Sequence, residues 1–151
     1  MINVIATTGA LLGPPWQAKE NGYLIKPKSS SLPSLYCEPH CMYDTKELSQ
    51  YKVDYVITPI ISQELPAYTL VDGMEKALKL AETLSASSII PMNNGGLNQS
   101  GLLSAIVGAK GSEEEFKNLM AKYSLPFKLE SIVPGEALIL KKTDKKPLLS
   151  L

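Results

Sequence analysis

The chain has 151 residues, 44% of them hydrophobic and 20% charged, a composition that predicts one soluble globular domain. Fifteen acidic and fifteen basic residues cancel to a formal net charge of zero, and all of the basic residues are lysines. A neutral chain without arginine argues against nucleic acid as a partner, because it offers neither a basic field nor the planar group that grips phosphates bidentately.

Neither export nor membrane insertion is predicted. The first residues lack the basic start and apolar run of a signal peptide, and no apolar stretch is long enough to span a membrane. The two cysteines are too few for a disulfide framework, and their Cys-x-x-x-Cys spacing is not that of a redox pair. A reducing compartment is therefore the default expectation.

Short apolar runs in the first part of the chain predict four strands, at residues 2–8, 22–26, 35–40 and 53–61. Glycine and proline residues place a loop between the first two of them. Pro39 must end the third strand or leave it at a sheet edge, because proline donates no hydrogen bond to a ladder. The fourth run is almost entirely apolar, which indicates a strand buried on both faces.

Helical patterns appear in the second part of the chain. Asp72, with Glu75 three residues later, predicts the start of a helix. Its apolar face is expected to contain Met74, Ala77, Leu78, Ala81 and Leu84. Ser112 and Glu115 form a capping box that predicts a later helix. That helix is expected to bury Phe116, Leu119, Met120 and Tyr123.

The remaining segments complete an α/β pattern. The expected elements are a buried strand at 88–92, a loop at 93–96, a short helix at 102–107, and one or two strands within 127–140. Strands followed by alternating helices and strands predict α/β layers around a mixed sheet. Residues 1–140 are expected to form one unit, and the lysine-rich residues 141–151 a flexible tail.

The stretch from Cys37 to Cys41, Cys-Glu-Pro-His-Cys, holds both cysteines and the single histidine. A structural zinc ion needs four ligands, and only three such side chains occur here. On an extended strand Cys37 and Cys41 point to one side while His40 points to the other. A self-contained zinc site is therefore not expected, and no Gly-x-Ser-x-Gly elbow accompanies His40 for serine catalysis.

Four segments, in this order, resemble the C-terminal half of the metallo-β-lactamase-fold hydrolases, especially a plant and cyanobacterial branch: 7–25, 35–44, 53–60 with the helix 73–84, and 87–96. The resemblance implies that residues 1–140 form half of an αββα sandwich, with a mixed sheet and covering helices. Catalytic members carry zinc or another divalent metal in a dinuclear site. A His-x-His-x-Asp-His motif in the N-terminal half and three later loops supply its ligands.

The three later loops have lost the expected ligands in this chain. Leu12 stands where the first loop of relatives has histidine, and Pro39 where the second has aspartate. Asn93 stands where the third loop ends in histidine, and one histidine in the whole chain rules out the first motif. No cofactor is therefore expected in this chain. The candidate residues of the former pocket are Leu12, Glu38, His40, Asn93 and Asn94.

These observations lead to three hypotheses of function. The first is a metallo-β-lactamase-like fragment with a degenerate metal site that is inactive alone. The second is the C-terminal half of a metal-dependent hydrolase acting on a small ester, phosphoester or lipid amide. The third is a small-ligand binding module.

A lone half would leave one apolar sheet face uncovered. The expected partner is therefore the missing N-terminal half of the domain or a second copy of the chain. The compartment stays open between cytoplasm and plastid, since plant members of this branch are often plastid proteins.

Overall fold

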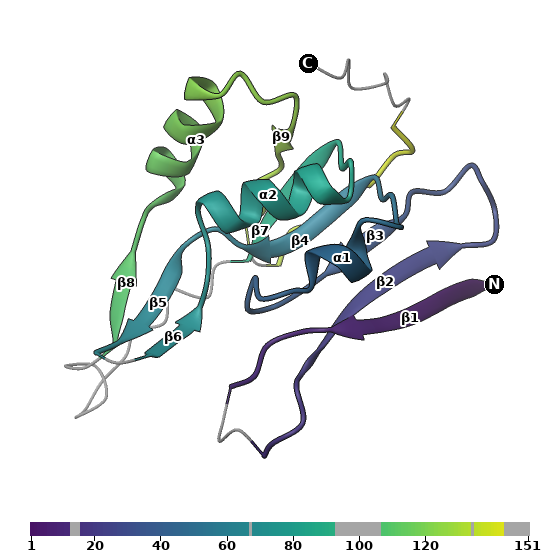
Figure 1. The fold of residues 1–151 in the computed structure, drawn as a ribbon. Coiled ribbons are helices and arrows are strands. Elements are labelled where there is room, and N and C mark those ends of the chain that lie inside the picture. The colour runs from purple at the N-terminus through teal and green to yellow at the C-terminus, as the bar shows by residue number, and fades with distance from the viewer. Residues whose placement is uncertain (13–15, 67, 93–106, 134, 144–151) are drawn as a thin grey trace.

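The computed structural model describes residues 1–12, 16–66, 68–92, 107–133 and 135–143. In chain order its elements are β1 (Ile2–Thr8), β2 (Asn21–Pro27), β3 (Leu35–Cys37), α1 (Thr45–Leu48), β4 (Tyr55–Pro59), β5 (Ser62–Leu65), β6 (Tyr68–Val71), α2 (Glu75–Thr83), β7 (Ser88–Met92), β8 (Gly108–Lys110), α3 (Glu113–Lys122) and β9 (Lys128–Leu129) (Figure 1). Within these ranges, none of the helices has the length and apolar character needed to cross a membrane.

The main sheet has six strands in the order β1-β2-β3-β4-β7-β9. The first three are antiparallel neighbours, and β3, β4, β7 and β9 run parallel to one another. A smaller antiparallel sheet has the order β6-β5-β8. α1 and α2 lie over one face of the main sheet (Figure 1). The predicted class, α/β with a mixed sheet and covering helices, is confirmed.

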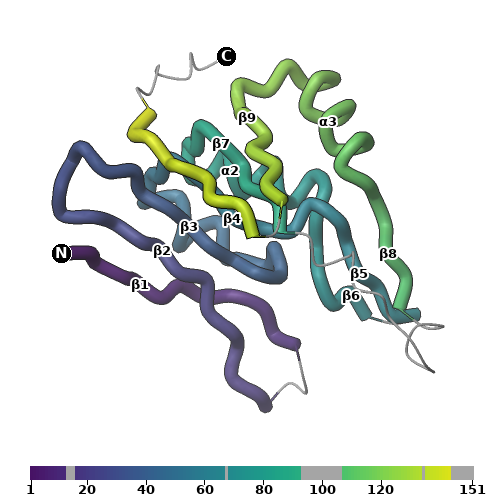
Figure 2. Tube along the Cα trace, turned by 180° about the vertical axis from the view of Figure 1, so that it is seen from behind, coloured from purple at the N-terminus to yellow at the C-terminus, as the bar shows by residue number. Residues whose placement is uncertain are grey.

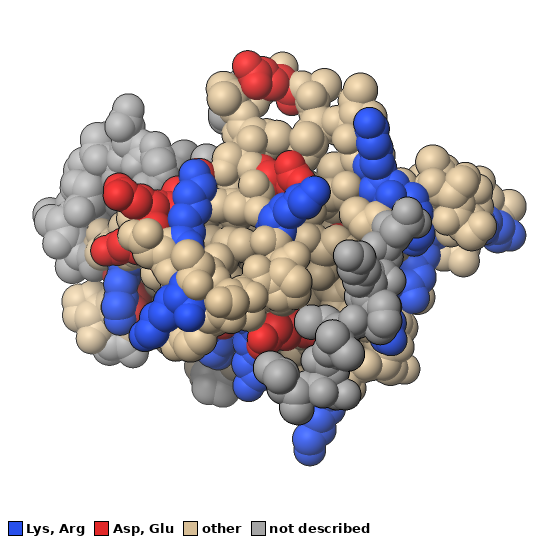
Figure 3. All heavy atoms as spheres, turned by 90° about the horizontal axis from the view of Figure 1, so that it is seen from above, with Lys and Arg blue, Asp and Glu red and all other residues tan. Residues whose placement is uncertain are grey.

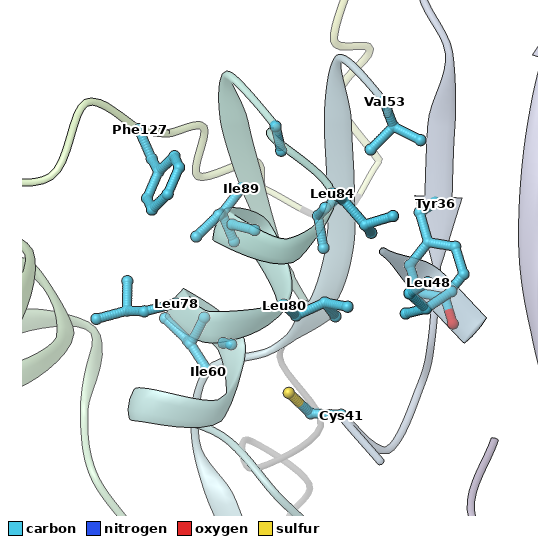
Figure 4. Close-up of a cluster of buried hydrophobic side chains, with 14 of the residues drawn as sticks. Tyr36, Cys41, Leu48, Val53, Ile60, Leu78, Leu80, Leu84, Ile89 and Phe127 are labelled. Carbon is cyan, nitrogen blue, oxygen red and sulfur yellow. The ribbon is translucent and has the colours of Figure 1, made fainter. Parts of the chain in front are cut away.

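The core lies between the main sheet and its covering helices. Tyr36, Val56 and Ile89 are paired across β3, β4 and β7, so their side chains share one face of the sheet. Leu80 of α2 and Leu48 of α1 pack against this face, and all five side chains are fully buried. Figure 4 labels Tyr36, Leu48, Leu80 and Ile89 of this group. Each such burial contributes about 1.5–3 kcal/mol to folding, so this layer is the main source of stability.

Several expected elements have the predicted bounds or caps. β1 and β7 span the predicted ranges, and α3 is capped by Ser112, whose hydroxyl accepts a hydrogen bond from the Glu115 amide at 3.1 Å. Of the predicted face of α3, Phe116 is buried, Leu119 and Met120 are half-buried against the core, and Tyr123 at the helix end is 54% exposed.

The prediction that Asp72 caps α2 is wrong. The residue before the helix is Met74, and it makes no capping bond through its side chain. The Asp72 amide donates to the His40 carbonyl at 2.8 Å, and the Met74 amide donates to the Ile60 carbonyl at 3.0 Å. These bonds to distant backbone set the path into the helix. The Asp72 carboxylate instead lies 3.3 Å from the Lys76 ammonium.

Short elements also differ from expectation. β3 ends at Cys37 rather than at residue 40, and β9 occupies two residues, while residues 136–140 are not in a strand. α1, β5, β6 and β8 are additional elements, and Asp44 caps α1 by accepting two backbone N–H bonds. The predicted loop at 93–96 and all but the last residue of the predicted helix at 102–107 lie outside the described residues.

The C-terminal segment 135–143 crosses the second face of the main sheet in front of β4 (Figure 2). The Tyr55 hydroxyl donates to the Lys141 carbonyl at 2.9 Å, and the Lys142 ammonium lies 2.8 Å from the buried Asp54 carboxylate.

Acidic and basic groups are interspersed on the face of the molecule seen in Figure 3. The flexible tail remains a prediction, because residues 144–151 lie outside the described ranges.

Candidate functional site

One edge of the main sheet collects the loops that hold the predicted site residues. The parallel strands β3, β4 and β7 all end at this edge. Because β2 is antiparallel to β3 and to β1, the chain leaves β1 and enters β2 at the same edge. Ligands of open α/β sheets bind outside the carboxyl ends of the strands, so this edge is the candidate site.

Glu38 lies at this edge directly after β3, and its side chain is fully buried. Its amide donates to the Ile57 carbonyl at 3.1 Å, which continues the pairing of β3 with β4. One carboxylate oxygen, Oε2, accepts the amides of His40 at 3.1 Å and Met42 at 2.8 Å. Cys41 has a positive φ of 54°, which turns the chain back over the carboxylate. The side chain therefore closes a tight turn.

His40 lies between two carboxylates that belong to different loops. Its Nδ1 is 3.5 Å from Glu20 Oε2 and 4.0 Å from Glu38 Oε1. Nδ1 and Glu38 Oε1 are buried and have no hydrogen-bond partner among the described residues. The edge therefore contains a Glu20–His40–Glu38 cluster with unused donor and acceptor capacity at its centre.

Sequence reasoning missed Glu20. The Gly9 amide donates to the Glu20 carbonyl at 2.8 Å, and the Glu20 amide donates to the Ala10 carbonyl at 2.7 Å. These bonds extend the β1–β2 register by one pair beyond Thr8 and Asn21. Pairing the first two predicted strands as a hairpin, and continuing that hairpin by one residue, would have placed Glu20 at the candidate edge.

Burial sets the protonation of the acids and thiols at this edge. Burial raises the pKa of Glu38 to about 7, although the amides of Met42 and His40 lower it. Its carboxyl therefore exchanges a proton near neutral pH. Burial also raises the pKa of Cys41 to about 12 and raises that of Cys37. Neither thiol has the lowered pKa of an activated nucleophile.

The residues at this edge do not fit a dinuclear metal centre. Leu12, half-buried on the loop at 9–20, and Pro39 have no donor atom in their side chains. In the part of the chain that is described, no group of three or more His, Cys, Asp or Glu side chains has an arrangement that could hold a metal ion.

The structure brings together two of the five predicted pocket residues, Glu38 and His40. Leu12 lies on a loop at the same edge. Asn93 and Asn94 lie outside the described residues. That all five share one pocket stays a prediction.

Comparison with known proteins gives a family and a fold. Residues 1–93 match the family model described as beta-lactamase superfamily domain. The structure is similar to the crystal structure of isothiocyanate hydrolase from Delia radicum gut bacteria, with a TM-score of 0.62 and 13% sequence identity. The similarity covers 93% of this chain and 54% of the hydrolase, so the chain spans about half the length of that protein. No curated protein sequence matches the chain.

Proposed function

The chain belongs to the beta-lactamase superfamily, and we propose that it is the C-terminal half of a metallo-β-lactamase-like domain with a degenerate metal site and no hydrolase activity of its own. The apolar second face of the main sheet, which is exposed at β1 and β2 and crossed by the segment 135–143 at β4, is the observation that carries this proposal. The match to about half of a solved hydrolase chain supports it.

The second face is apolar over adjacent strands. The register aligns Val4, Ile25, Leu35 and Tyr55 on this face in one row, and Ala6, Tyr23, Cys37, Ile57 and Ile90 in the next. On this face Val4 is 61% exposed and Tyr23 is 43% exposed, whereas Tyr55 and Ile90 are buried, so the open part of the patch lies over β1 and β2. An apolar patch of this continuity is typical of an interface. We infer that it packs against the complementary half of the domain or a second copy.

The degenerate metal site is proposed because side chains at two former ligand positions have no atoms that could bind a metal ion. A hydroxide held by metal ions requires a charged ligand set that lowers the pKa of the bound water. Leucine and proline at positions 12 and 39 cannot contribute to such a set. Glu38 already accepts two amide hydrogen bonds through one oxygen, so its carboxylate serves the turn.

Metal analysis tests the degenerate site. The purified chain is incubated separately with Zn²⁺, Mn²⁺ and Fe²⁺, dialysed, and measured by elemental mass spectrometry, with His40→Ala as the matched control. We expect substoichiometric metal in both proteins. One or more equivalents per chain, lost in His40→Ala, would overturn the proposal.

Sedimentation tests the inferred interface. Val4→Lys places a charge on the second face, and Leu32→Lys places one on a 53% exposed loop residue outside the strands. We expect the unmodified chain and Leu32→Lys to self-associate with increasing concentration, and Val4→Lys to remain monomeric. Equal behaviour of all three proteins would contradict the inferred interface.

A second candidate function is that of a half-enzyme, the C-terminal part of a metal-dependent hydrolase acting on a small ester, phosphoester or lipid amide. The match to half of a solved hydrolase favours this candidate. It predicts hydrolysis when the chain is co-expressed with an N-terminal half that carries the His-x-His-x-Asp-His motif, and none from either half alone.

A further inference from the structure

A hollow of about 440 Å³ lies beside the candidate edge. Its lining comes from four parts of the chain: Thr8, Gly9, Ala10 and Leu11; Lys19; Met42, Tyr43, Asp44 and Thr45; and Lys76. None of the predicted pocket residues is among them. The volume falls in the range of small-molecule sites, about 300–1,000 Å³.

Hydrogen bonds between separate elements fix the walls of this hollow. The Thr8 amide donates to Glu47 Oε2 at 2.9 Å, which ties the end of β1 to α1. The Tyr43 hydroxyl donates to the Lys76 carbonyl at 2.8 Å, which ties the β3–α1 loop to α2. The Tyr68 hydroxyl donates to the Leu11 carbonyl. The cavity is therefore formed in the free chain, which lowers the entropic cost of binding.

The charges around the hollow leave a cationic excess. Asp44 Oδ1 accepts the amides of Lys46 and Glu47, so this carboxylate is already engaged. Lys76 is shared with Asp72, 3.3 Å away, in a pair whose members are 58% and 28% exposed. Lys19 has no ion-pair partner within the described ranges. Two ammonium groups and the Asp44 carboxylate thus line the hollow, and Lys19 interacts electrostatically with Asp44 as Lys76 does with Asp72. Pairs of this kind at exposed positions are weak.

The rest of the lining combines apolar and hydroxyl groups. Ala10, Leu11, Met42 and the ring of Tyr43 provide apolar walls, and Thr8 and Thr45 add hydroxyl-bearing side chains. Polar groups make up the larger share of the exposed lining, so charged and hydroxyl groups dominate recognition here. This lining suits a small molecule with one anionic group and a limited apolar part.

We propose that this hollow binds a small organic carboxylate, with its anionic group between Lys19 and Lys76 and its apolar body against Leu11 and Met42. The inference goes beyond the proposed function and does not depend on it, because the hollow is lined by residues outside the former metal loops' ligand positions. A carboxylate carries two oxygens that can each accept from an ammonium group, while a neutral analogue of the same shape lacks the charge that lysines recognise.

Benzoate is the probe, and benzamide is its uncharged analogue of matched shape. Titration of the isotopically labelled chain at low ionic strength is followed through backbone amide signals by NMR. We expect benzoate to shift the signals of residues 8–11 and 42–45, and benzamide to leave them unchanged. Inorganic phosphate, which has no apolar body, should shift them less than benzoate.

Four variants sharpen the test. Lys19→Met and Lys76→Met should each weaken benzoate binding about threefold, as expected for loss of one exposed ion pair. Lys79→Met, on an exposed position of α2 outside the lining, should bind as the unmodified chain does. Asp72→Asn frees Lys76 from its partner and should strengthen binding about twofold.

The proposal is overturned if benzamide shifts the same signals as strongly, or if the signals affected by benzoate scatter over the surface. Equal weakening by Lys79→Met and Lys19→Met would likewise overturn it, because it would show a response to overall charge alone. Circular dichroism of each variant verifies that it is folded. Metal content and self-association, which test the proposed function, are independent of these outcomes.

Discussion

Replacing Glu38 with glutamine tests whether ionisation of the buried carboxyl lowers the free energy of unfolding at neutral pH. Glutamine has nearly the same shape and keeps an oxygen to accept the amides of His40 and Met42. Its amide nitrogen would lie where Glu38 Oε1 now has no hydrogen-bond partner among the described residues, 4.0 Å from His40 Nδ1. The substitution therefore removes the charge while preserving the turn.

The expected magnitude follows from the pKa of Glu38, which burial raises from 4.5 to about 7. A raised acid pKa means that the folded state favours the protonated form. The stability contributed by Glu38 is therefore complete below pH 4.5 and is lost as the pH rises toward 7. At about 1.36 kcal/mol for each pH unit of that interval, the loss is about 3 kcal/mol. Glutamine cannot ionise, so the Glu38→Gln variant does not lose this stability.

Urea unfolding followed by circular dichroism measures the effect between pH 4 and 8. We expect Glu38→Gln to match the unmodified chain at pH 4 and to exceed its free energy of unfolding by about 3 kcal/mol at pH 8. Glu64→Gln, at an exposed position of β5, is the matched control and should show no such trend. A difference that is constant with pH, or a loss of stability at pH 8, would refute the reasoning.

Three further predictions concern other parts of the fold. Burial alone would raise the pKa of Asp54, but the Lys142 ammonium and further hydrogen bonds lower it from 3.8 to about 2. Asp54→Asn should therefore destabilise the chain by about 2 kcal/mol above pH 4. In an acid titration of unfolding, this difference should vanish as the pH falls toward 2. A methyl group on Gly22 would lie 2.2 Å from the Tyr36 hydroxyl, so Gly22→Ala should cost about 1–3 kcal/mol in thermal unfolding. Cys41 is fully buried, with its pKa raised to about 12, and should resist iodoacetamide at pH 8 until urea unfolds the chain, as mass spectrometry would detect.

Local patterns predicted the elements whose formation depends on their own residues. β1 and β7 are short runs rich in apolar and β-branched residues that need only pairing neighbours, and α3 starts at a serine whose own hydroxyl makes the cap. The Asp72 cap failed because backbone bonds to His40 and Ile60, far away in sequence, determine the entry into α2. Such bonds leave no periodic signal in the sequence.

The candidate site was likewise predicted where local sequence determines it and missed where distant contacts do. The stretch from Cys37 to Cys41 was recognised by composition, and the loops' common edge follows from strand order. The contact between Glu20 and His40 was not predicted, because it joins two loops 20 residues apart whose meeting depends on the β1–β2–β3 pairing. The protonation state of Glu38 could not be predicted from the sequence either, because burial raises its pKa and burial is a property of the folded chain.

The turn after β3 indicates how the fold holds its site loops without help from a metal ion. In a metal centre, bonds from ligands to a shared ion hold loops together. Here Glu38 Oε2 accepts two amides of its own turn, and the His40 carbonyl accepts the Asp72 amide at 2.8 Å, which joins that turn to the entrance of α2. The Thr58 hydroxyl donates to the Glu38 carbonyl at 3.0 Å and joins the same turn to β4. Protein groups supply each of these links, and the side chains of Leu12 and Pro39, which have no donor atoms, take no part in them.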